Sequence, residues 1–152
     1  MNNMMINEYV IDAIKEYKII AIMRKIPADR ILVTAEALYK GGIRLIEVTF
    51  DQGKKTGEQE TLDAIKELEA AFKGRMHIGA GTVVTESQVE KAVEAGAKYI
   101  ISPNTDEAVI RKTKALGAVS IPGAFTPTEI VRAHQAGADF VKTSSGFGTG
   151  GA

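Results

Sequence analysis

The chain has 152 residues, which favours one domain over two, and residues 1–152 are expected to form a single unit. Hydrophobic residues make up 45% of it and charged residues 25%, which is globular usage and excludes disordered and collagen-like classes. Nineteen basic side chains balance nineteen acidic ones, which removes the general electrostatic case for nucleic acid or an anionic membrane as partner. With no cysteine and only two histidines, thiolate chemistry is excluded and no metal site is expected.

Short apolar runs rich in Ile and Val alternate with longer amphipathic segments along the whole chain. Near-continuous apolar runs of this kind are typical of a parallel sheet that is covered on both faces. Six strands are predicted, at residues 19–23, 43–50, 77–83, 99–102, 118–121 and 140–142.

Helices are predicted between these runs, because apolar residues recur there with a period of 3.6. The period holds in three segments, 31–38, 62–68 and 89–93. Thr85 with Gln88 predicts a capping box before the third of these. Further on, Thr126 predicts the cap of another helix, with Pro127 in its first turn.

The junctions between helix and strand repeat. Ala95-Gly-Ala-Lys-Tyr-Ile-Ile recurs as Ala136-Gly-Ala-Asp-Phe-Val-Lys, and each copy places glycine where a helix ends in left-handed geometry. One βα unit used several times leaves two options, an open doubly wound sheet or a closed (β/α)8 barrel. A barrel usually needs roughly 200 to 250 residues, so length alone favours the open sheet.

Polar residues occur at the carboxyl ends of the predicted strands, where βα proteins carry their chemistry. Glu47 lies inside an apolar strand, and a carboxylate buried there must be paired, hydrogen-bonded or raised in pKa. A structural ion pair or a solvent-facing strand edge would explain Glu47 equally well. The other candidates are Arg24, Thr49, Thr82, Pro103 and Lys142.

Lys142 ends the sixth predicted strand. A partly desolvated lysine beside another cation can lose its proton and attack a carbonyl carbon to give a Schiff base. A solvated surface lysine is the alternative. Glu47 and Lys142 in one series of βα units would supply a proton shuttle and a nucleophile, which is a more specific signal than either residue alone.

Two glycine-rich segments carry weaker signals. Residues 145–151 could form an anion-binding nest or a flexible terminus. Gly79-Ala-Gly-Thr lacks the third glycine of a dinucleotide fingerprint, so no such cofactor is expected.

Taken in order, five segments resemble the 2-keto-3-deoxy-6-phosphogluconate (KDPG) and 4-hydroxy-2-oxoglutarate aldolases. The resemblance covers about residues 8–142 and implies a (β/α)8 barrel, usually a homotrimer, which overrides the argument from length. It also implies reversible cleavage of a 2-keto-4-hydroxy acid to pyruvate and an aldehyde, without a cofactor or metal. The five segments are 41–49, 79–83, 101–103, 121–123 and 138–142.

The resemblance also implies roles for the residues that match. Lys142 matches the Schiff-base lysine of strand six, and Glu47 matches the general acid/base of strand two. Thr82 and Pro103 match positions that line the pyruvyl pocket. Thr49, which ends the strand of Glu47, is included as a substrate-binding candidate.

The carboxylate site departs from the family's pattern. Where the family often carries an arginine after strand two, this chain has Asp51. Arg24 is therefore expected to hold the substrate carboxylate, by a bidentate contact.

The segment from Lys142 to Ala152 resembles instead the lysine loop of deoxyribose-phosphate aldolase, which uses acetaldehyde. A (β/α)8-type barrel with only its first six strands, truncated or chimeric, would explain this combination of two resemblances in one sequence. Two alternatives stay open: an acetaldehyde-type aldolase, and a non-catalytic fragment that associates with itself to cover its open edges. The chain start lacks the pattern of a signal peptide and no apolar stretch of about 18 residues occurs, so a cytoplasmic protein without membrane contact is expected.

Overall fold

A computed structural model describes residues 3–143 of the chain, as six parallel strands with helices between them. Each strand runs in the same direction as its neighbour, so every connection is a crossover that carries a helix. The strands are β1 (Ile20–Met23), β2 (Leu45–Thr49), β3 (His77–Gly81), β4 (Tyr99–Ser102), β5 (Val119–Ala124) and β6 (Lys142–Thr143). The helices are α1 (Asn3–Tyr17), the short 3-10 helix η1 (Ala28–Arg30), α2 (Ile31–Lys40), α3 (Gly57–Phe72), α4 (Glu86–Glu94), α5 (Glu107–Ala115) and α6 (Pro127–Ala136).

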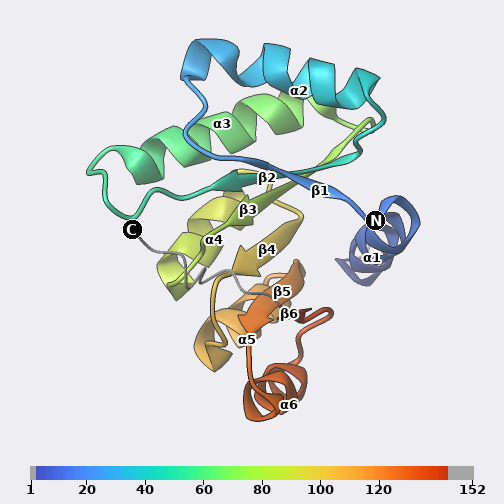
Figure 1. The fold of residues 1–152 in the computed structure, drawn as a ribbon, viewed down its shortest axis with the longest axis vertical. Coiled ribbons are helices and arrows are strands. Elements are labelled where there is room, and N and C mark those ends of the chain that lie inside the picture. The colour runs from blue at the N-terminus through green and yellow to red at the C-terminus, as the bar shows by residue number, and fades with distance from the viewer. Residues whose placement is uncertain (1–2, 144–152) are drawn as a thin grey trace.

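The order of the strands decides between the two architectures that the repeats allow. The sheet runs β1-β2-β3-β4-β5-β6 without a reversal, whereas a doubly wound sheet reverses its order at a switch point. The expectation of an open doubly wound sheet, drawn from chain length, is therefore wrong. Each crossover adds its strand at the same edge of the sheet, and with crossovers of one hand, right-handed as expected for parallel strands, helices α2 to α6 all cover the convex face (Figure 1). The twist of the parallel strands curls the sheet into a half-barrel.

The two faces of the curled sheet carry separate apolar clusters. Ile46, Val48 and Ile78 point outward and pack with the buried faces of α2, α3 and α4. Leu45 and Tyr99 point to the concave side and form a second cluster. Side chains alternate along a strand, so neighbouring residues of one strand necessarily serve opposite clusters.

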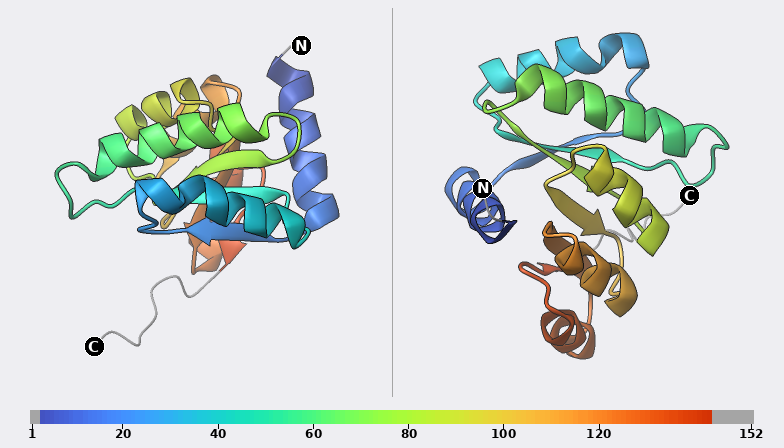
Figure 2. Two further views of the ribbon diagram at one scale, coloured as in Figure 1. Left: turned by 90° about the horizontal axis from the view of Figure 1, so that it is seen from above. Right: turned by 180° about the vertical axis from the view of Figure 1, so that it is seen from behind.

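Helix α1 was not anticipated from the sequence. Val10 of α1 joins the concave cluster with Leu45 and Val119, at the amino ends of the strands. Figure 2 shows α1 at the end of the sheet, apart from the layer of α2 to α6. The concave face is thereby covered at its amino end, while the carboxyl ends of the strands stay clear of α1.

The predicted caps form with one difference. Thr126 and Glu129 make a complete capping box, and Pro127 lies in the first turn of α6 as predicted. Thr85 accepts the N–H of Gln88, but the Gln88 side chain turns to the N–H of Val84, so the second half of that predicted box is absent. Within residues 3–143 no helix is long and apolar enough to span a bilayer.

Candidate active site

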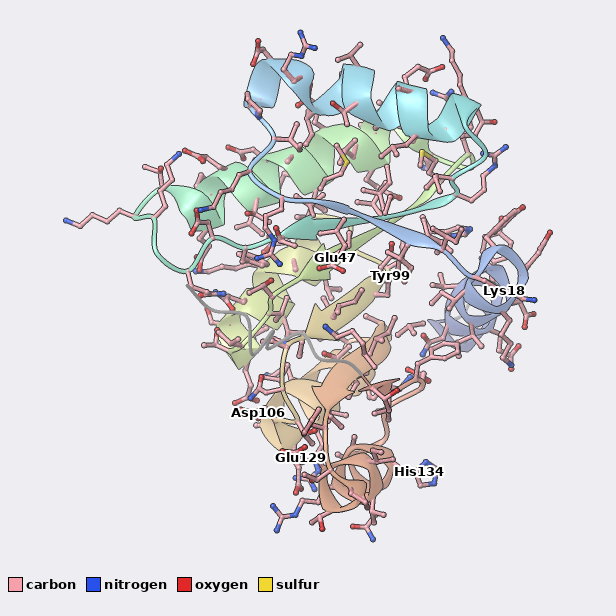
Figure 3. All side chains as sticks on the ribbon, in the orientation of Figure 1. Lys18, Glu47, Tyr99, Asp106, Glu129 and His134 are labelled. Atoms are coloured by element: carbon pink, nitrogen blue, oxygen red, sulfur yellow. The ribbon has the colours of Figure 1, made fainter. Side chains whose placement is uncertain are left out.

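Glu47 occupies the middle of β2 and points to the concave side of the sheet. It shares that side with Leu45 and Thr49, two residues before and after it, and only 5% of its surface is exposed. Figure 3 shows its carboxylate inside the curl, next to Tyr99. Burial raises the pKa of the Glu47 carboxyl, and the positive charges of Lys142 and Arg24 lower it by less. The charges of two predicted residues, Lys142 and Arg24, therefore act on a third, Glu47.

Glycines of β3 make room for the buried carboxylate. A Cβ atom at Gly81 would lie 1.7 Å from Oε1 of Glu47, so no larger residue fits there without displacing that side chain. The aromatic ring of Tyr99 covers Gly79 in the same way. The Tyr99 hydroxyl donates a hydrogen bond of 2.6 Å to the carbonyl oxygen of Ile46, the residue before Glu47.

Gly81→Ala is expected to lower the free energy of unfolding by about 1–3 kcal/mol, because the added methyl group overpacks the site of the Glu47 carboxylate. Denaturant unfolding followed by circular dichroism measures the change. Gly53→Ala is the matched control, since its Cβ would meet only Asp51 Oδ1, at 3.6 Å, and we expect a change within about 0.5 kcal/mol. Equal losses in the two variants would contradict the close packing inferred at Gly81.

Lys142 is the first residue of β6 and pairs with Gly123 of β5. Phe140, two residues earlier, packs against the concave cluster. Alternation places Lys142 on that same side of the sheet, which agrees with the effect of its charge on Glu47. Its side chain is half-buried.

Asp139 sets the position of this very short strand. Its Oδ2 accepts the N–H of Ser120 at 2.8 Å, and its own N–H donates to the carbonyl oxygen of Ser120 at 3.0 Å. Lys114 holds the same carboxylate in an ion pair of 2.7 Å. Asp139 thus both accepts from and donates to Ser120 of β5. These two hydrogen bonds align the chain against β5 three residues before Lys142.

The remaining predicted residues also lie where strands end. Arg24 follows β1 and is exposed, while Thr49 ends β2, is buried, and pairs with Gly81. Thr82 follows Gly81 directly. Pro103 follows β4, and a Cβ at Gly123 would lie 2.3 Å from its carbonyl oxygen, so Pro103 and Lys142 flank the same glycine.

Asp51, the departure from the family's pattern, turns toward its own loop and the loop after β1. Its Oδ2 lies 3.5 Å from Nζ of Lys25, and its Oδ1 accepts the N–H of Gly53 at 3.1 Å. From the β1 end of the sheet, it is the charge of Arg24 that lowers the pKa of Glu47.

Tyr99, which lies next to Glu47, and Asp139, which fixes the chain before Lys142, were not singled out from the sequence. Tyr99 of β4 reaches across β3 to a backbone carbonyl of β2, and Asp139 binds a backbone N–H of β5, so neither contact leaves a local motif. The alternation Gly79-Ala-Gly81 was the available signal that side chains from β2 and β4 lie over β3. The predicted anion nest at 145–151 lies outside the described residues. Within residues 3–143, no three His, Asp or Glu side chains converge in a way that could hold a metal ion.

The fold and this cluster define a class: a curled parallel β/α protein with a buried carboxylate in β2, a lysine beside the end of β5 and an arginine after β1. Residues 10–151 match the family description "KDPG and KHG aldolase". The chain belongs to the KDPG and KHG aldolase family.

Individual relatives agree with this assignment. A probable 2-dehydro-3-deoxy-6-phosphogalactonate aldolase of Rhizobium meliloti is 35% identical over 84% of this chain and 57% of its own length. The 2-dehydro-3-deoxy-6-phosphogalactonate aldolase of Escherichia coli K12 is 33% identical over 86% of this chain and 62% of its own. The chain thus spans about three fifths of these relatives.

Solved structures show the same relation. A native KDPGal structure superimposes with a TM-score of 0.74 at 32% identity, over 85% of this chain and 61% of the other. KDPG aldolase from Legionella pneumophila, with pyruvate captured as a covalent carbinolamine, gives a TM-score of 0.68 at 30% identity, over 78% and 54%.

Proposed function

We propose that this chain provides the catalytic core of a class I aldolase, which cleaves a 2-keto-4-hydroxy acid to pyruvate and an aldehyde. KDPG and 4-hydroxy-2-oxoglutarate are the substrates that the family suggests. The observation that carries the proposal is that the buried Glu47 carboxylate and the half-buried Lys142 lie on the same concave face of the sheet. The charges of Lys142 and Arg24, which lower the pKa of Glu47, agree with this placement. The pyruvate carbinolamine captured in the Legionella pneumophila relative supports the same chemistry.

Lys142 acts as the nucleophile in this proposal. Its neutral Nζ attacks the C2 ketone, and loss of water from the carbinolamine gives an iminium that can accept an electron pair. Glu47 removes the proton of the C4 hydroxyl, directly or through one water, while the C3–C4 bond breaks and its electrons flow into the iminium. The aldehyde leaves, Glu47 returns the proton to C3 of the enamine, and hydrolysis releases pyruvate and the free amine.

Four further residues bind the substrate in this proposal. The Arg24 guanidinium receives the substrate carboxylate, because its planar donors match two carboxylate oxygens. Thr49, Thr82 and Pro103 line the pyruvyl end, which limits the conformations of the bound keto acid. The pairing of Thr49 with Gly81, the position of Thr82 directly after Gly81 and the closeness of Pro103 to Gly123 support the roles of these three residues. The effect of the Arg24 charge on Glu47 supports the role of Arg24.

We further propose that the six strands correspond to the first six of a (β/α)8 barrel within a single domain of residues 1–152. The unreversed strand order and the three-fifths coverage of the relatives support this correspondence. A homotrimer that acts on small molecules is the assembly that the family implies, and the cytoplasm is the location expected from the sequence.

Reductive trapping tests the function. We expect borohydride with pyruvate to add the mass of one reduced pyruvate, and peptide mapping to place it on Lys142. An adduct with acetaldehyde and none with pyruvate would favour the second candidate, an acetaldehyde-type aldolase, which the sequence from Lys142 to Ala152 suggests. No adduct with either carbonyl, together with a concentration-dependent oligomer in light scattering, would favour a self-associating fragment.

A further inference from the structure

Thr82, one of the proposed substrate-binding residues, has an unfavourable backbone conformation. Its φ is +57°, in the left-handed region that β-branched residues rarely adopt. Such a conformation persists only when surrounding contacts hold it, and it concentrates at functional sites. Thr82 follows Gly81, the residue over which the Glu47 carboxylate lies, so this backbone turn occurs beside the candidate acid/base.

Two glutamine side chains hold the turn. Nε2 of Gln52, in the connection between β2 and α3, donates to the carbonyl oxygen of Thr82 at 2.7 Å. Gln88, in the first turn of α4, donates from its Nε2 to Oε1 of Gln52 at 3.0 Å. Oε1 of Gln88 accepts the N–H of Val84 at 2.9 Å and also lies 3.4 Å from Nε2 of Gln52.

Gln52 and Gln88 hydrogen-bond to the two peptide groups that flank Val83. One of these groups presents the Thr82 carbonyl and the other presents the Val84 N–H, so fixing both restricts the chain directly after Thr82. Gln88 is suited to this task because only 7% of its surface is exposed and both of its polar atoms are bonded. Gln52 is exposed, and its orientation therefore depends on Gln88.

We propose that Gln88 is a positioning residue for substrate binding: through Gln52 it holds Thr82 in the left-handed conformation beside Glu47. This inference rests on the proposed function, because the affected step is the binding of the keto acid. Gln88 itself touches no reacting atom. Its loss should weaken binding of the pyruvyl group and leave the nucleophile and the acid/base in place.

Gln88→Glu is the test variant, since it keeps the size and the acceptor for Val84 but replaces the donor to Gln52 by a second oxygen. The initial rate of borohydride trapping is measured against pyruvate concentration. We expect the half-saturating concentration to rise about tenfold, the upper end of the effect of losing one hydrogen bond. The maximal rate should stay within about twofold. Gln135→Glu, an exposed glutamine of α6, is the matched control and should change neither quantity.

Testing Gln88→Glu in a second sequence background, the Thr82→Gly variant, separates a positioning role from a general structural role. Glycine adopts positive φ freely, so in Thr82→Gly the turn needs less support. There, Gln88→Glu should raise the half-saturating concentration less than threefold. An equal rise in both backgrounds, a fall in maximal rate alone, or no change in either quantity would overturn the proposal.

If the wild-type chain forms no pyruvate adduct, the proposed function fails, but the positioning role can still be judged. Nuclear magnetic resonance shifts of Thr82 report its backbone conformation in the wild type and in Gln88→Glu. We expect these shifts to move toward values for negative φ in the variant. Unchanged shifts would overturn the positioning role as well.

Discussion

Lys142→Ala is expected to abolish the pyruvate adduct completely. Alanine has no nitrogen to attack the C2 ketone, so borohydride finds no imine to reduce at this position. Intact-mass spectrometry should show the variant at its unmodified mass after incubation with pyruvate and borohydride. Cleavage of the keto acid should fall to the uncatalysed rate, because the electron sink for C3–C4 cleavage is lost with the amine.

A surface lysine serves as the control for Lys142. Lys40 lies at the end of α2 with 75% of its side chain exposed and only a 4.0 Å contact to Glu36. Lys40→Ala should form the same adduct as the wild type. If Lys142→Ala still formed the pyruvate adduct, whether or not peptide mapping located it on another lysine, Lys142 would not be the nucleophile of the proposed mechanism.

Glu47→Gln should separate covalent capture from turnover. The amine of Lys142 is untouched, so the adduct with pyruvate should form, whereas turnover should fall by about 10²–10⁴-fold because an amide neither takes nor returns a proton. Steady-state cleavage assays beside trapping measure the two effects. Full turnover in the variant would mean that another group moves the proton.

The same variant should alter how stability depends on pH. Burial raises the pKa of the Glu47 carboxyl above its unfolded value, so the folded state binds more protons between those two pKa values. The contribution of Glu47 to the free energy of unfolding should therefore be fully present below the unfolded pKa and be lost as pH rises through the raised folded value. Glu47→Gln should remove this loss, as pH-dependent urea unfolding would show.

Local patterns predicted the strands well, because a buried parallel strand is a short apolar run whatever its place in the sheet. The predicted run at 99–102 matches β4, whereas β5 extends through Pro122 and Gly123 to Ala124, beyond its predicted end at Ile121. The architecture was not predictable from the same patterns. One βα unit looks alike in an open sheet and in a barrel, and only the order of strands in space separates them.

The candidate site divides in the same way. Glu47 and Lys142 are conspicuous as charged residues within or at the end of apolar runs, and both lie on the concave face. Gln88 was visible only as a cap residue, and its contact with Gln52 spans a loop and a helix that are distant in sequence. Contacts of this kind depend on how separate βα units dock together, which no single segment encodes.

The position of α1 at the amino ends of the strands has a wider consequence. Apolar side chains of α1 cover the concave face at this end, so among the described residues the opposite end of the strands is the one that α1 leaves uncovered. The apolar contacts with α1 and the residues of the candidate site therefore lie at opposite ends of the same strands. Substitutions at the carboxyl ends of the strands can therefore change the residues around Glu47 and Lys142 while the apolar contacts of α1 at the amino ends stay intact.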